Sequence, residues 1–348
     1  MPSKPSILLI ESTVQARDDV RRQALADKFN LIYYDCTSTA QFKERLQKPG
    51  GPYSNIIAIV RNGWLKAGPF AYHTPFATDI VPHFPPSLRL ICCSGHGHDT
   101  ADIDALTARG IWYCNTPNAC TEAVANTALA LVLDAFRHLS YAQWCARYDW
   151  MASRSLGDAS ASSVDPTNKV LGIVGLGDIG LAIAQKCEAA FNMSIHYQGP
   201  RRKPDAEKFL RHSATYHSSV DAMIPLVDCI LLAAPYTPAT HHLLSREQFA
   251  RAKAGGLRVV NIARGKMIDE DALLEALACG QVVGAGLDVH ANEPGINPAL
   301  RENWKVTVLP HIGVCSATSW EMFEKINLDN LMAFLETGRP LTPVNDIN

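Results

Sequence analysis

Short apolar runs alternate with helix-forming segments along the first third of the chain. The runs are bounded by polar or glycine-containing turns and span residues 7–10, 31–34, 56–60, 90–93 and 111–114. Between them, residues 18–29 and 40–47 place apolar side chains at the spacing of an amphipathic helix. Strands that alternate with helices predict a parallel sheet covered by helices.

The second half of the chain repeats this alternation after a long helical segment. Residues 121–147 lack glycine and proline and predict one helix that crosses between domains, and the Ser-, Ala- and Asp-rich segment 153–168 predicts a surface arm. Strand candidates follow at 170–174, 194–197, 229–233, 259–262, 283–287 and 306–309, and a last helix is expected at 319–336. The sequence therefore predicts two doubly wound α/β domains, residues 1–117 with 320–348 and residues 118–319, with the active site in the cleft between them.

Composition and charge exclude several classes of partner. The chain has 348 residues, of which 47% are hydrophobic and 19% charged, and its formal net charge is −2. This balance gives no electrostatic reason to expect nucleic acid or a membrane surface as a partner. No apolar stretch approaches the ~18 residues that cross a bilayer, and the run near the N-terminus is too short for a signal peptide, so a cytoplasmic location is expected.

The cysteine and histidine pattern does not indicate a metal site. Ten cysteines occur without a C-x-x-C pair, which predicts buried thiols in a reducing compartment. His96 and His98 are one residue apart, but no third possible ligand clusters with them. We therefore expect no metal.

A glycine-rich turn gives the first chemical indication. In "KVLGIVGLGDIGLAIAQKC", residues 169–187, an apolar run ends in Gly175, Gly177 and Gly180 and is followed by apolar residues at helical spacing. This strand, turn and helix match the phosphate-binding turn of a Rossmann-like domain, where glycines let a pyrophosphate approach the backbone N–H groups at the start of the helix. We expect a dinucleotide there, with Asp178 and Ile179 among its contacts.

The end of the next predicted strand indicates which dinucleotide is bound. Domains that bind NAD usually place Asp or Glu there, about 20 residues after the glycines, to accept the ribose hydroxyl groups. Here Gln198 occupies that position, no acidic residue occurs between 189 and 204, and Arg201 and Arg202 follow. Because guanidinium groups pair with phosphate, NADP(H) is favoured; NAD is possible if the arginines are only a solvated surface run.

Polar residues follow three further strand candidates. Arg264 lies in "VVNIARG", Asp288 and Glu293 lie in "GLDVHANEP", and His311 lies in "VLPHIG". Reduction of a 2-oxo acid requires a cation for the carboxylate, a proton donor near neutral pH and a group that orients the donor. Arginine, histidine and glutamate meet these needs, although each has an ordinary structural interpretation when taken alone.

Together the motifs resemble a known family. The glycine loop, N-x-A-R-G, L-D-V-x-x-x-E-P and P-H-I-G occur in this order, and over essentially the whole chain the sequence resembles the D-isomer-specific 2-hydroxyacid dehydrogenase family. The segment "SGHGHDTADIDALTARGIWYCNTP" is similar to that family's substrate-domain signature. "APYTPATHHLL" and "GLDVHANEP" look most similar to fungal D-mandelate dehydrogenases and fungal 2-keto acid reductases.

The resemblance implies a catalytic role for each polar residue. His311 would protonate the keto oxygen, Glu293 would hydrogen-bond the other ring nitrogen, and Arg264 would hold the carboxylate and polarise the carbonyl. Residues 1–117 with 320–348 would be the substrate domain, and residues 118–319 would bind the dinucleotide.

Further contacts are implied for the substrate and the cofactor. The backbone N–H groups of Gly97 and His98 would bind the substrate carboxylate, and Asn62 and Gly63 align with the substrate-specificity loop. The remaining cofactor contacts would be Pro235, Thr240, Ala263 and Asp288. Asp288 matches the aspartate that binds the nicotinamide carboxamide in the family, with a structural turn acid as the alternative.

Two segments depart from the family pattern. Trp64, Phe70 and Tyr72 either line a pocket for a bulky substrate side chain or pack in an ordinary loop. After His311, "GVCSATSW" differs from the more usual G-x-x-T, which leaves the local contacts open.

The preferred function is an NADPH-linked reductase that converts a 2-oxo acid to a D-2-hydroxy acid. The alternatives are an NAD-dependent dehydrogenase of D-mandelate type and a non-enzymatic, NAD(P)-sensing regulatory protein of the same fold. A homodimer is expected from the family, with the long helix and the 153–168 arm at the interface. The sequence leaves open the physiological acid, from glyoxylate and hydroxypyruvate to branched and aromatic 2-oxo acids, the reaction direction and the degree of NADP preference.

Overall fold

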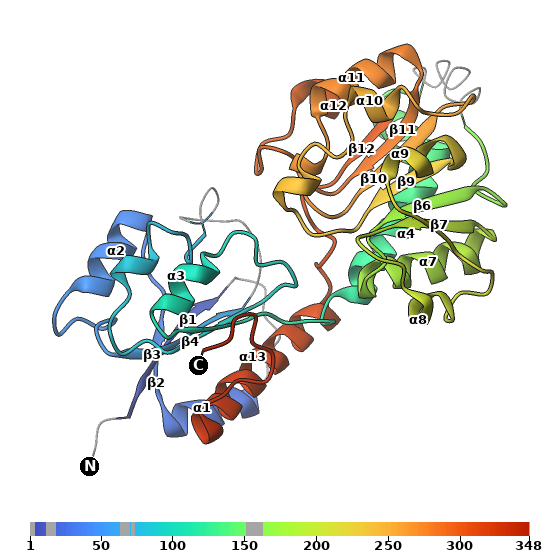
Figure 1. Cartoon of the computed structure of the whole chain (residues 1–348). Helices are drawn as coiled ribbons and strands as arrows, with labels where there is room; N and C mark the ends of the chain where they lie inside the picture. The colour runs from blue at the N-terminus through green and yellow to red at the C-terminus, as the bar shows by residue number, and fades with distance from the viewer. Residues whose placement is uncertain (1–3, 12–18, 63–69, 71–73, 151–162, 348) are drawn as a thin grey trace. The chain divides into compact units, whose positions relative to one another are not determined.

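The apolar runs of the sequence form the strands of two parallel sheets, as predicted. The computed structural model describes residues 4–11, 19–62, 70, 74–150 and 163–347. The chain divides into two units, Met1–Cys120 with Cys315–Asn348 and Thr121–Val314 (Figure 1). The sequence interpretation places these divisions at 117/118 and 319/320.

The first unit contains a five-stranded parallel sheet in the order β2-β1-β3-β4-β5. Its strands are β1 (Ser6–Glu11), β2 (Asn30–Tyr33), β3 (Ile56–Asn62), β4 (Leu90–Cys93) and β5 (Trp112–Cys114). Its helices are α1 (Asp19–Lys28), α2 (Thr39–Gln47), the 3-10 turn η2 (Val81–His83), α3 (Ile103–Ala108) and α13 (Ala317–Thr337).

Strand β1 shows why these strands appear as continuous apolar runs. Ile7 and Leu9 pack with α1 and α13 on one face of the sheet, whereas Leu8 and Ile10 pack with α2, η2 and α3 on the other. Successive side chains of a strand point to opposite faces, so a sheet covered on both faces requires apolar residues at every position.

The second unit contains a seven-stranded parallel sheet in the order β12-β11-β10-β9-β6-β7-β8. Its strands are β6 (Val170–Val174), β7 (Ser194–Gln198), β8 (Thr215–His217), β9 (Cys229–Leu232), β10 (Leu257–Asn261), β11 (Val282–Leu287) and β12 (Val306–Val308). Its α-helices are α4 (Thr121–Arg137), α5 (Leu139–Tyr148), α7 (Asp178–Phe191), α8 (Pro204–Glu207), α9 (Val220–Met223), α10 (Arg246–Phe249), α11 (Glu270–Cys279) and α12 (Pro298–Arg301). Its 3-10 turns are η4 (Ile224–Leu226), η5 (Pro238–Thr240) and η6 (Gly265–Met267).

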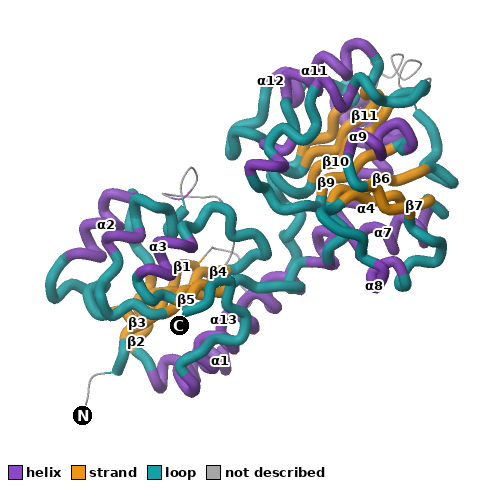
Figure 2. The backbone as a smooth tube through the Cα atoms, in the orientation of Figure 1, coloured by secondary structure: helices purple, strands orange, loops and turns teal. Residues whose placement is uncertain are grey.

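Helices cover both faces of the second sheet as well (Figure 2). Helices α4 and α7 pack together on one face, and α9, α10 and α11 enclose the apolar core on the other. Strand β6 lies between β7 and β9, and from β6 the chain order runs outward in both directions. Such a reversal opens a crevice at the carboxyl ends of the central strands, where open α/β sheets bind ligands.

The predicted crossing helix is wrong in two respects. Residues 121–147 form two helices, because His138 adopts a left-handed conformation (φ 51°) between α4 and α5. The buried Asp134 carboxylate accepts hydrogen bonds from the backbone N–H and the hydroxyl of Ser140 (2.8 and 2.6 Å) and from the Thr307 hydroxyl, and so fixes the start of α5. Both helices also belong to the second unit, so neither crosses between units.

The structure also bears on a strand that the sequence did not predict, on the cysteines, on the arm and on the membrane expectation. Strand β8 was not predicted, because Thr215–His217 is too short to show a period. Eight of the ten cysteines are buried, as expected, but Cys279 and Cys315 are exposed. Most of the predicted arm lies outside the described residues. Within the described residues, no helix is long and apolar enough to cross a membrane.

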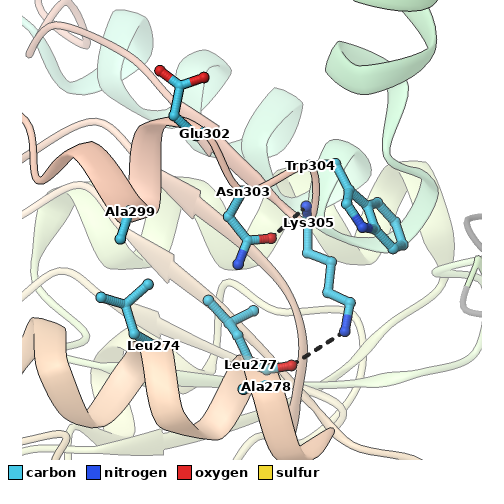
Figure 3. Close-up of a pocket in the computed structure, with 8 residues that line it drawn as sticks. All are labelled: Leu274, Leu277, Ala278, Ala299, Glu302, Asn303, Trp304 and Lys305. Atoms are coloured by element: carbon cyan, nitrogen blue, oxygen red, sulfur yellow. Dashed lines mark hydrogen bonds between the residues drawn. The ribbon is translucent and has the colours of Figure 1, made fainter. Parts of the chain in front are cut away.

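An open pocket of about 380 Å³ lies at the amino end of β12 (Figure 3). Helices α11 and α12 form its walls together with Trp304 and Lys305, and the Lys305 ammonium group donates a hydrogen bond to the Leu277 carbonyl (3.1 Å). None of the site residues predicted from the sequence lines this pocket.

Candidate active site

Close contacts require two of the three glycines after β6, and the third faces open space. Gly175 has φ 95°, and a Cβ there would lie 2.9 Å from the Ala233 carbonyl oxygen. A Cβ on Gly180 would overlap the carbonyl oxygen of Gly175, so the start of α7 packs directly on the turn. A Cβ on Gly177 would meet no atom within 4 Å. The open side of Gly177 leaves space for a phosphate against the first turn of α7, where Asp178 and Ile179 lie.

The residues that would select the dinucleotide follow β7. Gln198 ends the strand, and its carbonyl accepts a hydrogen bond from Gly175 N–H (2.9 Å), which fixes the strand end next to the glycine turn. Arg201 and Arg202 are exposed. Arg202 forms a two-pronged ion pair with Glu207 of α8, with distances of 2.9 Å from Nε and 2.8 Å from Nη2.

The Arg202–Glu207 pair changes the electrostatic interpretation of this turn. Hydrogen bonds from Arg202 and from the Tyr197 hydroxyl hold the pKa of Glu207 below its ordinary value, so this carboxylate is charged. One negative charge therefore offsets one of the two guanidinium groups. Arg201 is the arginine of this turn for which no ion pair with a described residue is present.

The other predicted cofactor contacts follow β9 and β10. Pro235 and Thr240 lie in one turn, where the Thr240 hydroxyl donates to the Pro235 carbonyl (2.9 Å) and accepts from Thr237 N–H (2.8 Å). Ala263 follows β10 and is buried. These contacts show that the Thr240 side chain shapes its own turn.

Arg264 lies in a turn braced by Asn261, a buried residue at the end of β10. The Asn261 amide donates to the Arg264 carbonyl (2.9 Å) and accepts from Ala263 N–H (3.0 Å). The Arg264 guanidinium donates to the Ala263 carbonyl (2.7 Å). Asn261 therefore fixes the backbone from which the arginine extends. Sequence reasoning assigned Asn261 no role, although it is the first residue of the motif N-x-A-R-G.

Glu293 and His311 are brought together from the loops after β11 and β12. The distance from His311 Nδ1 to Glu293 Oε2 is 2.8 Å, and both side chains are largely buried. A carboxylate only accepts hydrogen bonds, so Nδ1 carries the proton and faces Glu293. This is the arrangement of a histidine oriented for proton transfer.

Asp288 holds the backbone that carries His311. Its two carboxylate oxygens accept hydrogen bonds from the N–H groups of Ile312 and Gly313, each at 2.8 Å. His311 itself has φ 56°, a left-handed conformation that costs a non-glycine residue roughly 1–2 kcal/mol. Burial raises the pKa of Asp288, and the two N–H donors oppose that rise. These contacts support the alternative interpretation of Asp288, in which its carboxylate is a structural part of the turn.

The predicted carboxylate-binding loop lies in the first unit, after β4. Gly95 has φ 111° and is fixed by Thr116, whose hydroxyl accepts from Gly95 N–H (2.8 Å). The Asn115 amide donates to the His96 carbonyl (2.8 Å). Gly97 and His98 are exposed, and their N–H groups donate to no other described residue.

Asn327 of α13 connects the ends of β3 and β4. Its amide nitrogen contacts Asn62 Oδ1 (2.9 Å) and Ser94 Oγ (3.1 Å), and the side chain is fully buried. Sequence reasoning missed this residue, because nothing marks one asparagine on a helix that lies 265 positions after its partner. Asn62 is thereby positioned; Gly63 lies outside the described residues.

Of the three aromatic residues considered for a substrate pocket, Phe70 is described. It is 6% exposed and packs against Tyr34 and Phe42 in the core of the first unit. Phe70 is therefore a core residue, whereas Trp64 and Tyr72 lie outside the described residues. Among the described residues, no cluster of three or more His, Cys, Asp or Glu side chains suits a metal ion.

Known proteins are similar to this chain over nearly its whole length. The family model of the D-isomer specific 2-hydroxyacid dehydrogenase, NAD binding domain, matches residues 129–313. The 4-methyl-2-oxopentanoate reductase A of Aspergillus oryzae is 32% identical over 98% of this chain and 98% of its own length.

Solved structures agree with the sequence matches. Apo D-mandelate dehydrogenase of Rhodotorula graminis superposes with a TM-score of 0.89 at 33% identity, covering 99% of both chains. The NADPH-dependent glyoxylate/hydroxypyruvate reductase of Sinorhizobium meliloti, solved with NADP and malonate, gives a TM-score of 0.75 at 29% identity over 98% of this chain and 97% of its own.

Proposed function

This chain belongs to the D-isomer specific 2-hydroxyacid dehydrogenase family, and from that premise we propose that it is an NADPH-linked reductase that converts a 2-oxo acid to a D-2-hydroxy acid. The observation that carries this proposal is the hydrogen bond between Glu293 and His311, two side chains from the loops after neighbouring strands. Arg264 follows the next strand of the same sheet. Acid, orienting group and cation thus come from three adjacent strand ends.

Each residue has a distinct role in the proposed reaction. The Arg264 guanidinium binds the substrate carboxylate and polarises the keto group, and the N–H groups of Gly97 and His98 bind the same carboxylate. His311 Nε2 gives a proton to the keto oxygen, and Glu293 stabilises the imidazolium from which that proton comes. In the reverse direction, His311 accepts the hydroxyl proton.

The turn at 175–180 would hold the dinucleotide, with Gly177 next to its phosphates. Asp288 would lie near its nicotinamide end. When bound, it supplies the hydride that adds to the substrate carbonyl carbon. Pro235, Thr240 and Ala263 would line the same edge of the sheet.

The preference for NADP(H) rests on the turn after β7. Gln198 leaves the ribose without a carboxylate partner, and Arg201 supplies a cation for a 2′-phosphate. Arg202 is already neutralised in part by Glu207, so Arg201 should contribute more to the selectivity than Arg202. The name of the Sinorhizobium meliloti relative, which is NADPH-dependent, agrees with this assignment.

The proposed substrates share a carboxylate beside a keto group. The names of the relatives include glyoxylate/hydroxypyruvate, 4-methyl-2-oxopentanoate and D-mandelate, so they range from the smallest 2-oxo acid to branched and aromatic side chains. Arg264 and His311 recognise the shared part of these molecules, and the shape of the site must discriminate among their side chains.

We also propose that the enzyme acts as a homodimer. Tyr141, Trp144 and Tyr148 form a continuous row of stacked or tilted rings along α5. Trp144 is 47% exposed and Tyr148 is 73% exposed. Exposed aromatic rows of this kind are characteristic of protein interfaces, and a second copy of the chain is the partner that the family suggests.

A cofactor and substrate assay tests the proposed activity. Loss of nicotinamide absorbance would be followed with NADPH or NADH and with glyoxylate, hydroxypyruvate, 4-methyl-2-oxopentanoate or phenylglyoxylate. We expect turnover with NADPH well ahead of NADH. Arg201→Ser should lower kcat/KM for NADPH about 10- to 100-fold and leave NADH unchanged, because it removes a phosphate contact worth ~1.5–3 kcal/mol.

Arg211→Ser is the matched control, since it removes one exposed positive charge from the same unit outside the β7 turn. Equal use of NADH, or an Arg201→Ser variant that behaves like this control, would reject the NADPH assignment in favour of an NAD-dependent enzyme. NADPH binding without turnover of any 2-oxo acid would reject the reductase and favour a nucleotide sensor.

A further inference from the structure

His290 lies at the point where the loops of the proposed catalytic residues meet. It follows β11 between Asp288 and Glu293, and its side chain is 5% exposed. In the motif L-D-V-x-x-x-E-P it occupies the first of the three variable positions. The pattern therefore gives it no role.

Hydrogen bonds connect His290 with two of the catalytic loops. Its backbone N–H donates to Glu293 Oε1 (3.0 Å), the carboxylate oxygen that His311 does not use. Its imidazole Nε2 lies 2.8 Å from the carbonyl oxygen of Leu309, two residues before His311. Since a carbonyl oxygen only accepts, Nε2 must carry the proton.

The third loop packs on the His290 backbone. A Cβ on Gly265, the residue after Arg264, would overlap the carbonyl carbon and oxygen of His290. The next residue, Ala291, donates its N–H to Glu270 Oε1 (3.0 Å) at the start of α11. The turn that carries Arg264 is thus in direct contact with the backbone of His290.

The second ring nitrogen of His290, Nδ1, makes histidine less favourable for the stability of the fold than an apolar residue would be here. With the proton on Nε2, Nδ1 is a hydrogen-bond acceptor, and it is buried without a partner among the described residues. A buried acceptor left unpaired loses its hydration without a replacement, which offsets the benefit of the bond to Leu309. An apolar side chain of similar volume would carry no such cost. The distinctive contribution of the imidazole is therefore the geometry that its Nε2–H imposes.

We propose that His290 is a positioning residue of the active site: its Nε2–H holds the Leu309 carbonyl, and its backbone N–H holds Glu293, so that the Glu293–His311 hydrogen bond keeps its length and direction. This inference rests on the proposed function for its catalytic consequence, whereas the geometry itself is independent of the reaction. His290 acts through Glu293 and His311 and touches no reacting atom.

Removal of the side-chain donor releases one end of this connection. In His290→Leu, the Leu309 carbonyl loses its hydrogen bond to the β11 loop, whereas the bonds of Ile312 and Gly313 to Asp288 remain. A shift of about 1 Å at a proton-transferring group costs on the order of 100-fold in rate. We therefore expect kcat to fall about 10- to 100-fold. The Kd for NADPH should stay within about twofold, because the proposed phosphate contacts lie in the turn at 175–180 and no hydrogen bond among the described residues joins His290 to that turn.

His290→Gln is the matched variant that keeps the donor. A glutamine amide places an N–H group near the position of Nε2 and can donate to the Leu309 carbonyl. We expect its kcat to lie within about threefold of the unmodified enzyme. A purely structural role predicts a different result. The melting temperature would then fall in both variants, and kcat per folded molecule would be unchanged in both. Should His290→Leu not fold, His290→Asn takes its place, because its shorter amide reaches only the Nδ1 position.

Nuclear magnetic resonance of protein labelled with ¹⁵N-histidine supplies a readout that needs no substrate. The Nδ1–H proton of His311 is assigned by its loss in His311→Gln. We expect this hydrogen-bonded proton to resonate at the same position in the unmodified protein and in His290→Gln, and to shift or exchange away in His290→Leu.

Two results would overturn the inference. One is an unchanged His311 resonance in His290→Leu, and the other is an equal loss of kcat in His290→Leu and His290→Gln. If the unmodified enzyme turned over no 2-oxo acid, the proposed function would fail and the His311 resonance alone would decide the role of His290.

Discussion

At the scale of single residues, the two carboxylate oxygens of Glu293 have separate partners in two different loops. Oε1 accepts from His290 N–H and Oε2 contacts His311 Nδ1. An amide has one accepting oxygen, so glutamine can satisfy only one of these two donors and turns its NH₂ group toward the other.

We predict that Glu293→Gln lowers kcat about 10- to 100-fold, because it breaks one of two hydrogen bonds and removes the charge that stabilises the imidazolium. Steady-state kinetics with NADPH would measure the loss. Glu275→Gln removes an exposed carboxylate from the same unit and should leave kcat unchanged. A Glu293→Gln enzyme as fast as that control would exclude Glu293 from catalysis.

At the scale of elements, β7 and β8 form an edge with an unusual pair of histidines. His196 Nδ1 and His217 Nε2 are 3.0 Å apart, and the rings stack with centroids at 5.0 Å. Burial lowers the pKa of both groups below the ordinary value of 6.5, and for His196 the charges of His217 and Lys253 lower it further. Below pH 6.5 the unfolded chain therefore binds more protons than the folded one.

The sign of the pH effect follows from this difference. A depressed histidine pKa contributes stability that is present above pH 6.5 and is lost as the pH falls through the folded value. We predict that the melting temperature of the unmodified protein falls more steeply between pH 7.5 and pH 5 than that of His217→Gln. His212→Gln, which alters an exposed histidine of the same unit, should keep the steep dependence. Parallel curves for all three proteins would contradict the prediction.

At the scale of the whole molecule, the break between α4 and α5 sets the direction of the surface that we propose for the dimer. Asp134 fixes the start of α5, and the helix then presents the aromatic row of Tyr141, Trp144 and Tyr148. A single helix over 121–147 would have directed these side chains elsewhere. The proposed dimer surface therefore depends on a contact between Asp134 and the sheet strand that ends near Thr307.

We predict that replacing Trp144 and Tyr148 together with serine converts a dimer to a monomer in sedimentation velocity. Aromatic side chains at the centre of an interface commonly contribute 2 kcal/mol or more each, roughly a 30-fold change in Kd. Phe209→Ser removes an aromatic side chain that is 67% exposed elsewhere in the unit and should not change the mass. A monomeric unmodified protein would refute the dimer.

The sequence by itself determined the described strands other than β8, the helices α1, α2, α7 and α13, the glycine turn and the polar residues at strand ends. These features follow from local rules: apolar runs mark buried strands, glycine permits φ near 95° at Gly175, and ligand-binding residues follow parallel strands. Local rules failed where a distant side chain intervened, as Asp134 and Thr307 did at the end of α4.

Only the tertiary structure decided which polar groups meet. The bond of Asn327 to Asn62 spans 265 positions, and the contacts of His290 join loops that follow three different strands. No pattern along the chain encodes such pairs, because they depend on strand order and on the packing of loops at one edge of a sheet. The sequence could therefore name Glu293 and His311 as partners by resemblance, but it gave no sign of the neighbouring residue that the fold places between their loops.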